Sequence, residues 1–191
     1  MSLPIPLFED LVAAHRILPT RKPVEVLQIN VGKLCNQACY HCHVEAGPKR
    51  TEVMEKKTVE RLIELLDQSP TIHTIDITGG APELKPDFRF LVAEIYHKKR
   101  TIIDRCNLTV LCERGQEDTA QCLREYRVNV VASLPCYTKK NVEAQQGGGV
   151  FDKSIRALQW LNELGYGRDH SGLELNLVYN PVGWHNLRLR F

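Results

Sequence analysis

Three cysteines and two histidines are crowded into the sequence GKLCNQACYHCH at residues 32–43. The cysteines are Cys35, Cys39 and Cys42, and His41 and His43 stand beside the third of them. Thiolates and imidazoles are good ligands for transition metals, so this spacing indicates a metal centre held by one short loop. No further cysteine lies close by in the sequence to complete a pair or a tetrahedron.

Three interpretations of this cysteine triplet compete. A zinc ion needs four ligands, usually from two separated pairs, so His41 or His43 would have to complete a cramped site. Three structural cysteines in a loop are a second alternative, although loops are poor places to bury thiols. An iron–sulfur cube fits better, because one loop can give thiolates to three irons and leave the fourth iron open for a small molecule.

A second motif, TGGAPE at residues 78–83, contains paired glycines. Without side chains, Gly79 and Gly80 let backbone amides and carbonyls approach a ligand closely, although a tight turn alone would also explain them. Both motifs follow expected strands at their carboxyl ends, where barrel enzymes place their chemistry. We therefore expect an amino-acid-like ligand between the metal centre and the backbone of this motif.

The rest of the chain alternates between strand and helix patterns. Strands are expected at residues 24–31, 71–78, 101–111, 128–134 and 173–180. Helices are expected at residues 8–17, around 59–66, and at 88–98, 115–126 and 151–165, with a flexible loop at 145–149. This alternation predicts an α/β fold with right-handed crossovers and a parallel sheet.

The first and last of these strands are polar on one face. Gln28 and Asn30 oppose an apolar face in the first, and Glu174 and Asn176 do so in the last. A flat parallel sheet covered on both sides is usually apolar throughout. The pattern therefore favours an open partial barrel with helices outside and a wet or ligand-filled inner side.

Length and composition limit the domain organisation, the partners and the cellular environment of the chain. The chain has 191 residues, 43% hydrophobic and 25% charged, with a net charge of +2. We divide it into a lead-in at 1–23, one domain at 24–180 and an atypical tail at 181–191. The small charge gives no reason to expect nucleic acid or an anionic membrane as a partner. Seven cysteines and no signal-peptide or membrane-spanning pattern predict a cytoplasmic, reducing environment.

These motifs resemble those of the radical S-adenosylmethionine (SAM) superfamily. Cys35-x3-Cys39-x2-Cys42 matches its cluster motif, with His41 where an aromatic residue is usual before the last cysteine. Gly79-Gly80-Ala81-Pro82 resembles its Gly-Gly-Glu-Pro motif, with Ala81 in place of the glutamate. The backbone of this motif can still contact a ligand with Ala81 in place of the glutamate, whereas no carboxylate is available at this position.

Five longer segments resemble sequences of the arsenosugar-biosynthesis branch of this superfamily. They are LQINVGKLCNQACYHCHVEAGPKRTE, DITGGAPEL, IDRCNLTVL, NVVASLPCY and GVFDKSIRALQWLNELGYG. The resemblance implies a partial (β/α)6 barrel that uses a [4Fe–4S] cluster and an electron donor such as flavodoxin or ferredoxin. It implies cleavage of SAM to methionine and a 5′-deoxyadenosyl radical, which would join a methylated trivalent arsenic species such as a dimethylated one.

The resemblance also assigns roles to residues of this chain. Cys35, Cys39 and Cys42 would ligate the cluster, and the backbone of the motif made of Thr78, Gly79, Gly80, Ala81 and Pro82 would meet the amino group of methionine. Asn107 and Ser133, in the third and fourth strands, would be weaker candidates for the ribose or carboxylate.

Four cysteines stand apart from the triplet: Cys106, Cys112, Cys122 and Cys136. Each alone is best interpreted as a small buried apolar residue. Trivalent arsenic is soft and binds thiolates, however, so Cys106, Cys112 and Cys136 are also candidate substrate ligands. Cys136, just past the fourth strand, is the best of these, and a structural role is its alternative.

The sequence departs from the resembling family after residue 183, where NPVG gives way to WHNLRLRF. We expect the barrel to lack its last strand and the family's C-terminal domain. Two other functions stay open: a peptide-modifying maturase of the same superfamily, and a non-catalytic metal-binding module, either zinc-bound or truncated.

Overall fold

The fold is built on one parallel sheet of five strands in the order β1-β2-β3-β4-β5. The computed structural model describes residues 7–15, 20–40 and 42–180. The strands are β1 Val26–Asn30, β2 Thr74–Thr78, β3 Thr101–Cys106, β4 Asn129–Ser133 and β5 Leu175–Val178. Five parallel strands in sequence order confirm the expected α/β partial barrel.

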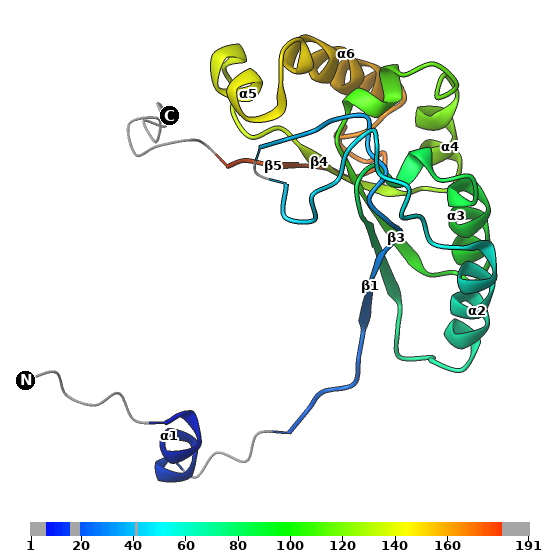
Figure 1. The fold of residues 1–191 in the computed structure, drawn as a ribbon. Helices are drawn as coiled ribbons and strands as arrows, with labels where there is room; N and C mark the ends of the chain where they lie inside the picture. The colour runs from blue at the N-terminus through cyan, green and yellow to red at the C-terminus, as the bar shows by residue number, and fades with distance from the viewer. Residues whose placement is uncertain (1–6, 16–19, 41, 181–191) are drawn as a thin grey trace, which may run out of the picture.

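Helices connect the strands, and α2, α3 and α4 lie along one side of the sheet (Figure 1). The α-helices are α1 Phe8–Ala14, α2 Lys56–Asp67, α3 Phe88–His97, α4 Thr119–Glu125, α5 Lys139–Gln146 and α6 Val150–Glu163, and the 3-10 helices are η1 Pro82–Leu84 and η2 Thr109–Cys112. The lead-in contains the short helix α1, none of whose residues is buried. Among the described helices, none is long and apolar enough to cross a membrane.

The hydrophobic core lies between the sheet and these helices. Ile75, Ile77 and Ile102 project from neighbouring strands and are at most 2% exposed, and α2 adds Val59 and Ile63 to the same core. Fully burying one such aliphatic side chain contributes about 1.5–3 kcal/mol. The helical spacing of the apolar residues in α2 is therefore what attaches this helix to the sheet.

The other face of the sheet is polar, as the alternation in the first strand predicted. Gln28 lies opposite Asp76 in the β1–β2 ladder, and Arg105 on β3 contacts the same carboxylate. Polar groups on one face and helices on the other give the sheet an inner, ligand-accessible side.

Two segments differ from the sequence-based prediction. The third strand ends at Cys106 rather than continuing to residue 111, because the side chain of Asn107 accepts a hydrogen bond from Val110 N at 3.0 Å and starts η2. Residues 145–149 are not simply a loop, since Gln145 and Gln146 form the end of α5 and are 7% and 6% exposed. The predicted tail at 181–191 lies outside the described residues.

Candidate functional site

A cavity of about 250 Å³ opens at the carboxyl ends of the strands. It brings together residues from the cysteine loop (residues 32–47), from the ends of β2, β3 and β4, and from α5. The lining residues are Cys35, Gln37, Cys39, Cys42, His43, Val44, Ala46, Thr78, Gly79, Gly80, Arg105, Asn107, Ser133 and Gln146. All three cysteines of the triplet therefore face one space, although they come from an irregular loop.

Backbone hydrogen bonds give the cysteine loop its shape. Cys35 N donates to Gly47 O at 3.2 Å, and Cys42 N donates to Cys39 O at 3.3 Å. Two amides donate to sulfur: Gln37 N to Cys35 Sγ at 3.4 Å, and Ala46 N to Cys42 Sγ at 3.2 Å. Such amides stabilise negative charge on sulfur and are a recognised influence on the potential of iron–sulfur clusters.

The paired glycines pack directly against this loop. Gly80 N donates to Gly32 O at 2.9 Å, and Ala81 N donates to Leu34 O at 2.8 Å. A Cβ atom on Gly80 would lie 2.3 Å from Leu34 O, and one on Gly79, where φ is +149°, would lie 2.7 Å from Gly32 O. The glycines are thus needed for close approach to the loop backbone, beside any contact with a ligand.

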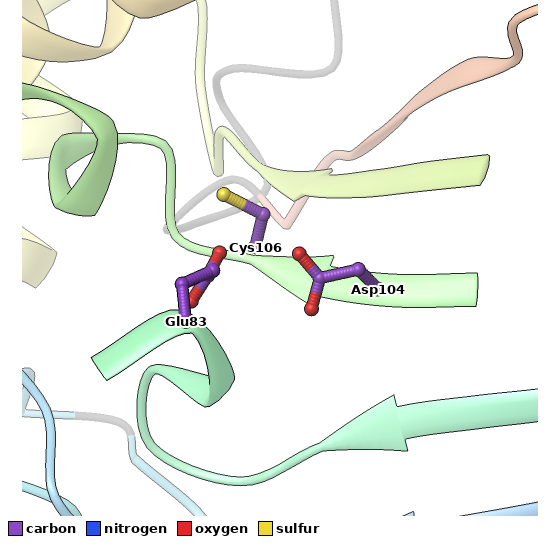
Figure 2. A group of neighbouring side chains, drawn as sticks. All are labelled: Glu83, Asp104 and Cys106. Atoms are coloured by element: carbon purple, nitrogen blue, oxygen red, sulfur yellow. The ribbon is translucent and has the colours of Figure 1, made fainter. Parts of the chain in front are cut away.

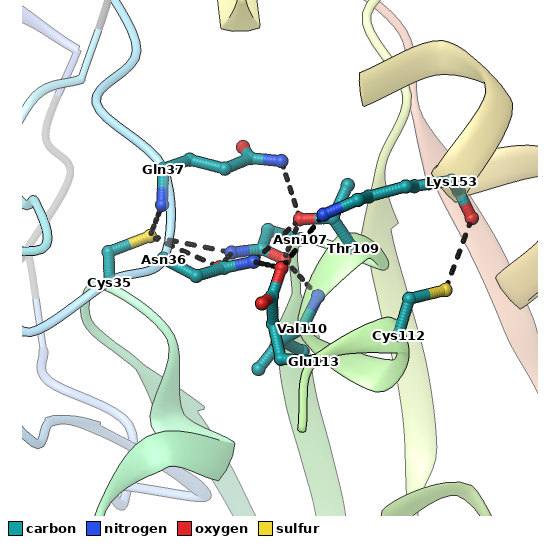
Figure 3. Close-up of polar contacts among 9 residues, drawn as sticks. All are labelled: Cys35, Asn36, Gln37, Asn107, Thr109, Val110, Cys112, Glu113 and Lys153. Carbon is teal, nitrogen blue, oxygen red and sulfur yellow. Dashed lines mark hydrogen bonds and ion pairs between the residues drawn. The ribbon is translucent and has the colours of Figure 1, made fainter. Parts of the chain in front are cut away.

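A side-chain network, the cysteine-loop network, joins the same loop to the end of β3 (Figure 3). Asn107 Nδ2 donates to Asn36 Oδ1 at 2.8 Å and to Cys35 Sγ at 3.4 Å. Thr109 Oγ1 accepts from Asn36 Nδ2 at 2.9 Å and from Gln37 Nε2 at 2.7 Å. The position of Cys35 therefore depends on residues more than seventy positions away in the sequence.

The environment of the thiols favours a positive centre. Burial raises the pKa of Cys35, and burial together with the charges of Cys35 and Cys42 raises the pKa of Cys39 to about 11. Three neighbouring thiolates are costly when nothing offsets their charge, whereas metal binding displaces their protons. Three thiols around one cavity fit a cluster bound by three cysteines. His43 also lines the cavity, so zinc stays an alternative, and His41 lies outside the described residues.

The family model described as the radical SAM superfamily matches residues 29–185. The chain belongs to the radical SAM superfamily. The matched region contains the cysteine triplet, the glycine motif, the last two residues of β1 and all of β2 to β5. Members of this enzyme superfamily use a [4Fe–4S] cluster and SAM, which confirms the cofactors that the resemblance implied.

The curated relatives of this chain are named for different activities. A probable GTP 3′,8-cyclase of Pyrococcus horikoshii is 26% identical over 164 residues, covering 82% of this chain and 47% of that protein. Mycofactocin maturase MftC of Mycobacterium tuberculosis is 27% identical over 144 residues, covering 75% of this chain and 35% of that protein. The chain spans less than half the length of these relatives.

Solved structures share the fold. Streptococcus suis SuiB bound to S-adenosylmethionine matches with a TM-score of 0.63 and 20% identity, covering 93% of this chain and 38% of that one. The anSMEcpe structure with bound AdoMet also matches with a TM-score of 0.63 and 20% identity, covering 82% of this chain and 43% of that one. At this identity the likeness establishes the radical SAM barrel fold.

Most residues predicted for the radical SAM site lie at the cavity, and three do not. Thr78, Gly79, Gly80, Asn107 and Ser133 line it, together with the three cysteines of the triplet. Ala81 is fully buried behind the motif, and Pro82 begins η1. Cys136 is 3% exposed and packs with Leu134, Val142 and Val150 in a small apolar cluster.

The isolated cysteines are not all buried, which corrects one expectation. Cys106, Cys122 and Cys136 are buried, whereas Cys112 is exposed. Cys112 lies at the end of η2, and its Sγ is 3.6 Å from Lys153 O, so it belongs to the surface between η2 and α6.

Sequence reasoning missed three polar residues that line the cavity, Gln37, Arg105 and Gln146, and two apolar ones, Val44 and Ala46. Strand alternation could have found Arg105, because it shares its face of β3 with Ile103 and projects to the inner side. Its Nε and Nη2 contact both carboxylate oxygens of Asp76, at 2.7–3.1 Å. Burial acts to raise the pKa of the Asp76 carboxyl, but hydrogen bonds from Arg105 and Gln28 outweigh it and hold the pKa below its ordinary value.

Proposed function

We propose that residues 24–180 form the SAM-cleaving part of an enzyme that transfers the 5′-deoxyadenosyl group to a methylated trivalent arsenic species. The observation that carries the SAM-cleaving half is the single cavity that gathers the cysteine triplet, the paired glycines and Ser133. The proposal that arsenic is the substrate depends on the longer sequence segments that resemble the arsenosugar branch, and on the thiol of Cys136.

In this proposal each part of the cavity has a separate task. Cys35, Cys39 and Cys42 would hold a [4Fe–4S] cluster, which would supply the electron for SAM cleavage. The backbone of the motif from Thr78 to Pro82 binds the methionine amino group, and Ser133 reaches the ribose or carboxylate. Both amide atoms of Asn107 are already hydrogen-bonded within the cysteine-loop network, which favours a positioning role over direct contact.

Cys136 is the proposed soft substrate ligand, although its side chain is buried and lies outside the lining of the cavity, so its proposed role depends on the state of its thiol. It lies three residues beyond Ser133, and its Sγ accepts a hydrogen bond from Asn141 Nδ2 at 3.4 Å and lies 3.6 Å from Thr138 Oγ1. Burial acts to raise the pKa of this thiol, but these hydrogen bonds outweigh it and lower the pKa. A more readily formed thiolate binds trivalent arsenic more strongly.

The overall transfer balances without a net oxidant or reductant. The C5′–S bond of SAM breaks and methionine leaves with its electron pair, while the arsenic lone pair provides both electrons of the new C5′–As bond. Arsenic is oxidised from trivalent to pentavalent, and the electron given by a donor such as flavodoxin or ferredoxin is needed to start the reaction and is recovered at its end.

The named relatives favour a second candidate, a peptide-modifying maturase. One curated relative is a mycofactocin maturase, and a related solved structure is SuiB bound to its precursor peptide SuiA. A maturase would use the same cluster and SAM but would accept a peptide in place of arsenic.

The deciding experiment is anaerobic incubation of the reconstituted, reduced protein with SAM and either dimethylated trivalent arsenic or a peptide substrate. We expect 5′-deoxyadenosine and, with arsenic, a product of the mass of the adenosyl–arsenic adduct. Cys39→Ala is expected to abolish both. A Cys136→Ser variant with unchanged affinity for arsenic would remove the role of that thiol, and modification of the peptide alone would favour the maturase.

A matched pair of glycine variants tests the packing of the motif against the loop. Gly80→Ala places a methyl group against Leu34 O and is expected to lower 5′-deoxyadenosine formation by about tenfold or more. Gly148→Ala is the control, because a Cβ there meets nothing within 4 Å. Equal activity in the two variants would contradict the geometry proposed for the site.

A further inference from the structure

A second cluster of ligand-type side chains lies on the helix-covered side of the sheet. Glu83, Asp104 and Cys106, here called the acidic cluster, come from η1 and β3 and point toward one another (Figure 2). One ligand atom from each lies within 4.8 Å of the others. Their residues are 4%, 0% and 0% exposed, respectively. Strand alternation puts Asp104 on the face opposite to Arg105, so this cluster is separate from the cavity.

The carboxylates of the acidic cluster have no partners outside the cluster. Within the described part of the chain, no other residue donates a hydrogen bond to the four carboxylate oxygens of Glu83 and Asp104, although Glu83, Asp104 and Cys106 lie close enough to share protons with one another. The described ion pairs likewise include neither residue. Cys106 Sγ accepts one hydrogen bond, from Leu108 N at 3.2 Å, but burial and the neighbouring carboxyls raise the pKa of this thiol, so a metal ion would have to displace its proton.

Two adjacent buried carboxylates need something positive between them, because removing each charge from water costs several kcal/mol. Burial raises the pKa of both carboxyls, so a shared proton is one answer. A single shared proton joins two of the four oxygens and the Cys106 thiol can donate to one more, which still leaves one oxygen unsatisfied. A divalent cation can attract both carboxylates and the thiolate at once.

We propose that Glu83, Asp104 and Cys106 bind a divalent transition-metal ion of the zinc class. One sulfur and carboxylate oxygens are ligands that zinc accepts, and the sulfur disfavours magnesium and calcium. Because η1 directly follows the glycine motif, the ion ties this motif to β3 from behind. This site does not depend on the proposed function, since its ligands are not those of the cluster.

The test measures zinc in the full chain after the cluster ligands have been removed. In a Cys35→Ala, Cys39→Ala, Cys42→Ala variant we expect about one tightly bound zinc ion per chain by elemental analysis. Adding Asp104→Asn is expected to lower zinc content to a tenth or less. Cobalt bound in place of zinc should show a sulfur-to-cobalt charge-transfer band.

A matched cysteine pair assigns the sulfur ligand. Cys106→Ser is expected to remove the charge-transfer band, whereas Cys122→Ser, at another buried cysteine in α4, leaves it unchanged. The proposal would be overturned if the variant that lacks the three cluster cysteines held no zinc and showed no charge-transfer band. It would also be overturned if adding Asp104→Asn left the zinc content of that variant unchanged. Should the triple variant fail to fold, the rise in melting temperature that zinc gives over chelator is compared between the wild-type chain and Asp104→Asn: a smaller rise in Asp104→Asn supports the proposal, and an equal rise overturns it.

Discussion

Asp76 and Asp104 are buried aspartates on neighbouring strands, on opposite faces of the sheet, and their surroundings differ completely. Asp76 is held by Arg105 and Gln28 at 2.7–3.1 Å, and its pKa is lowered although burial opposes this. Asp104 has no hydrogen-bond partner outside the acidic cluster among the described residues, and burial beside Glu83 raises its pKa well above the ordinary value. Burial alone therefore does not decide the state of a carboxylate here, because the partners supplied by the fold decide it.

Removing the partner of Asp76 gives the largest expected effect on this comparison. Arg105→Met leaves a carboxylate that is 7% exposed without its cation, and we expect a loss of about 2 kcal/mol in the free energy of unfolding at pH 7. This figure is below that of a fully buried pair, because the Arg105 side chain is 44% exposed.

Arg89→Met is the control for this variant. It breaks the ion pair with Asp118, whose side chain is 69% exposed, and is expected to lower the free energy of unfolding much less than Arg105→Met does. Urea denaturation of both variants measures the difference. Equal losses would show that the inner-face pair behaves as an ordinary surface pair.

The stability of the Asp76→Asn variant at acid pH tests the role of the Asp76 charge. The folded pKa of Asp76 is lowered, so its stabilisation is fully present above the ordinary value of about 3.9 and is lost as the pH falls through the folded pKa. We expect Asp76→Asn to cost about 1 kcal/mol at pH 7, and the difference from wild type to shrink below pH 4. Urea midpoints across this range test it, and a difference that stays constant down to acid pH would contradict it.

Asp104→Asn should behave in the opposite way and have the smallest effect. In protein treated with a chelator, replacing a carboxyl group that has no partner is expected to cost less than about 0.5 kcal/mol. With zinc present the same variant should lose the stabilisation that the ion gives to wild type. A loss in chelator as large as that of Asp76→Asn would mean that Asp104 has a stabilising partner.

The sequence was sufficient for the order of the five strands and for the inner polar face, but not for α5, which was not predicted. The helical spacing in α2 and the alternation of Gln28 and Asn30 are local patterns with a direct physical cause, so both could be predicted. The end of β3 could not, because it depends on the side chain of Asn107 bonding to Val110 N. The apolar run continues through LTVL, and periodicity alone does not distinguish a strand from a 3-10 turn there.

The candidate site shows the same division between local and long-range information. Spacing predicted the cysteine triplet and the glycine motif as one site, and both line the cavity. The dependence of Cys35 on Asn107, and the contribution of Gln146 from a polar helix with a single buried apolar residue, Val142, come from tertiary contacts. The pairing of Glu83 with Asp104 is likewise invisible until η1 is placed beside β3.

The most direct test of the central claim is electron paramagnetic resonance of the anaerobically reconstituted, reduced chain, with and without SAM. We predict about four irons per chain and the signal of one reduced [4Fe–4S] cluster, absent in Cys39→Ala, whose shape changes when SAM binds the open iron. A signal that SAM leaves unchanged, or zinc in place of iron at the cysteine triplet, would contradict the account.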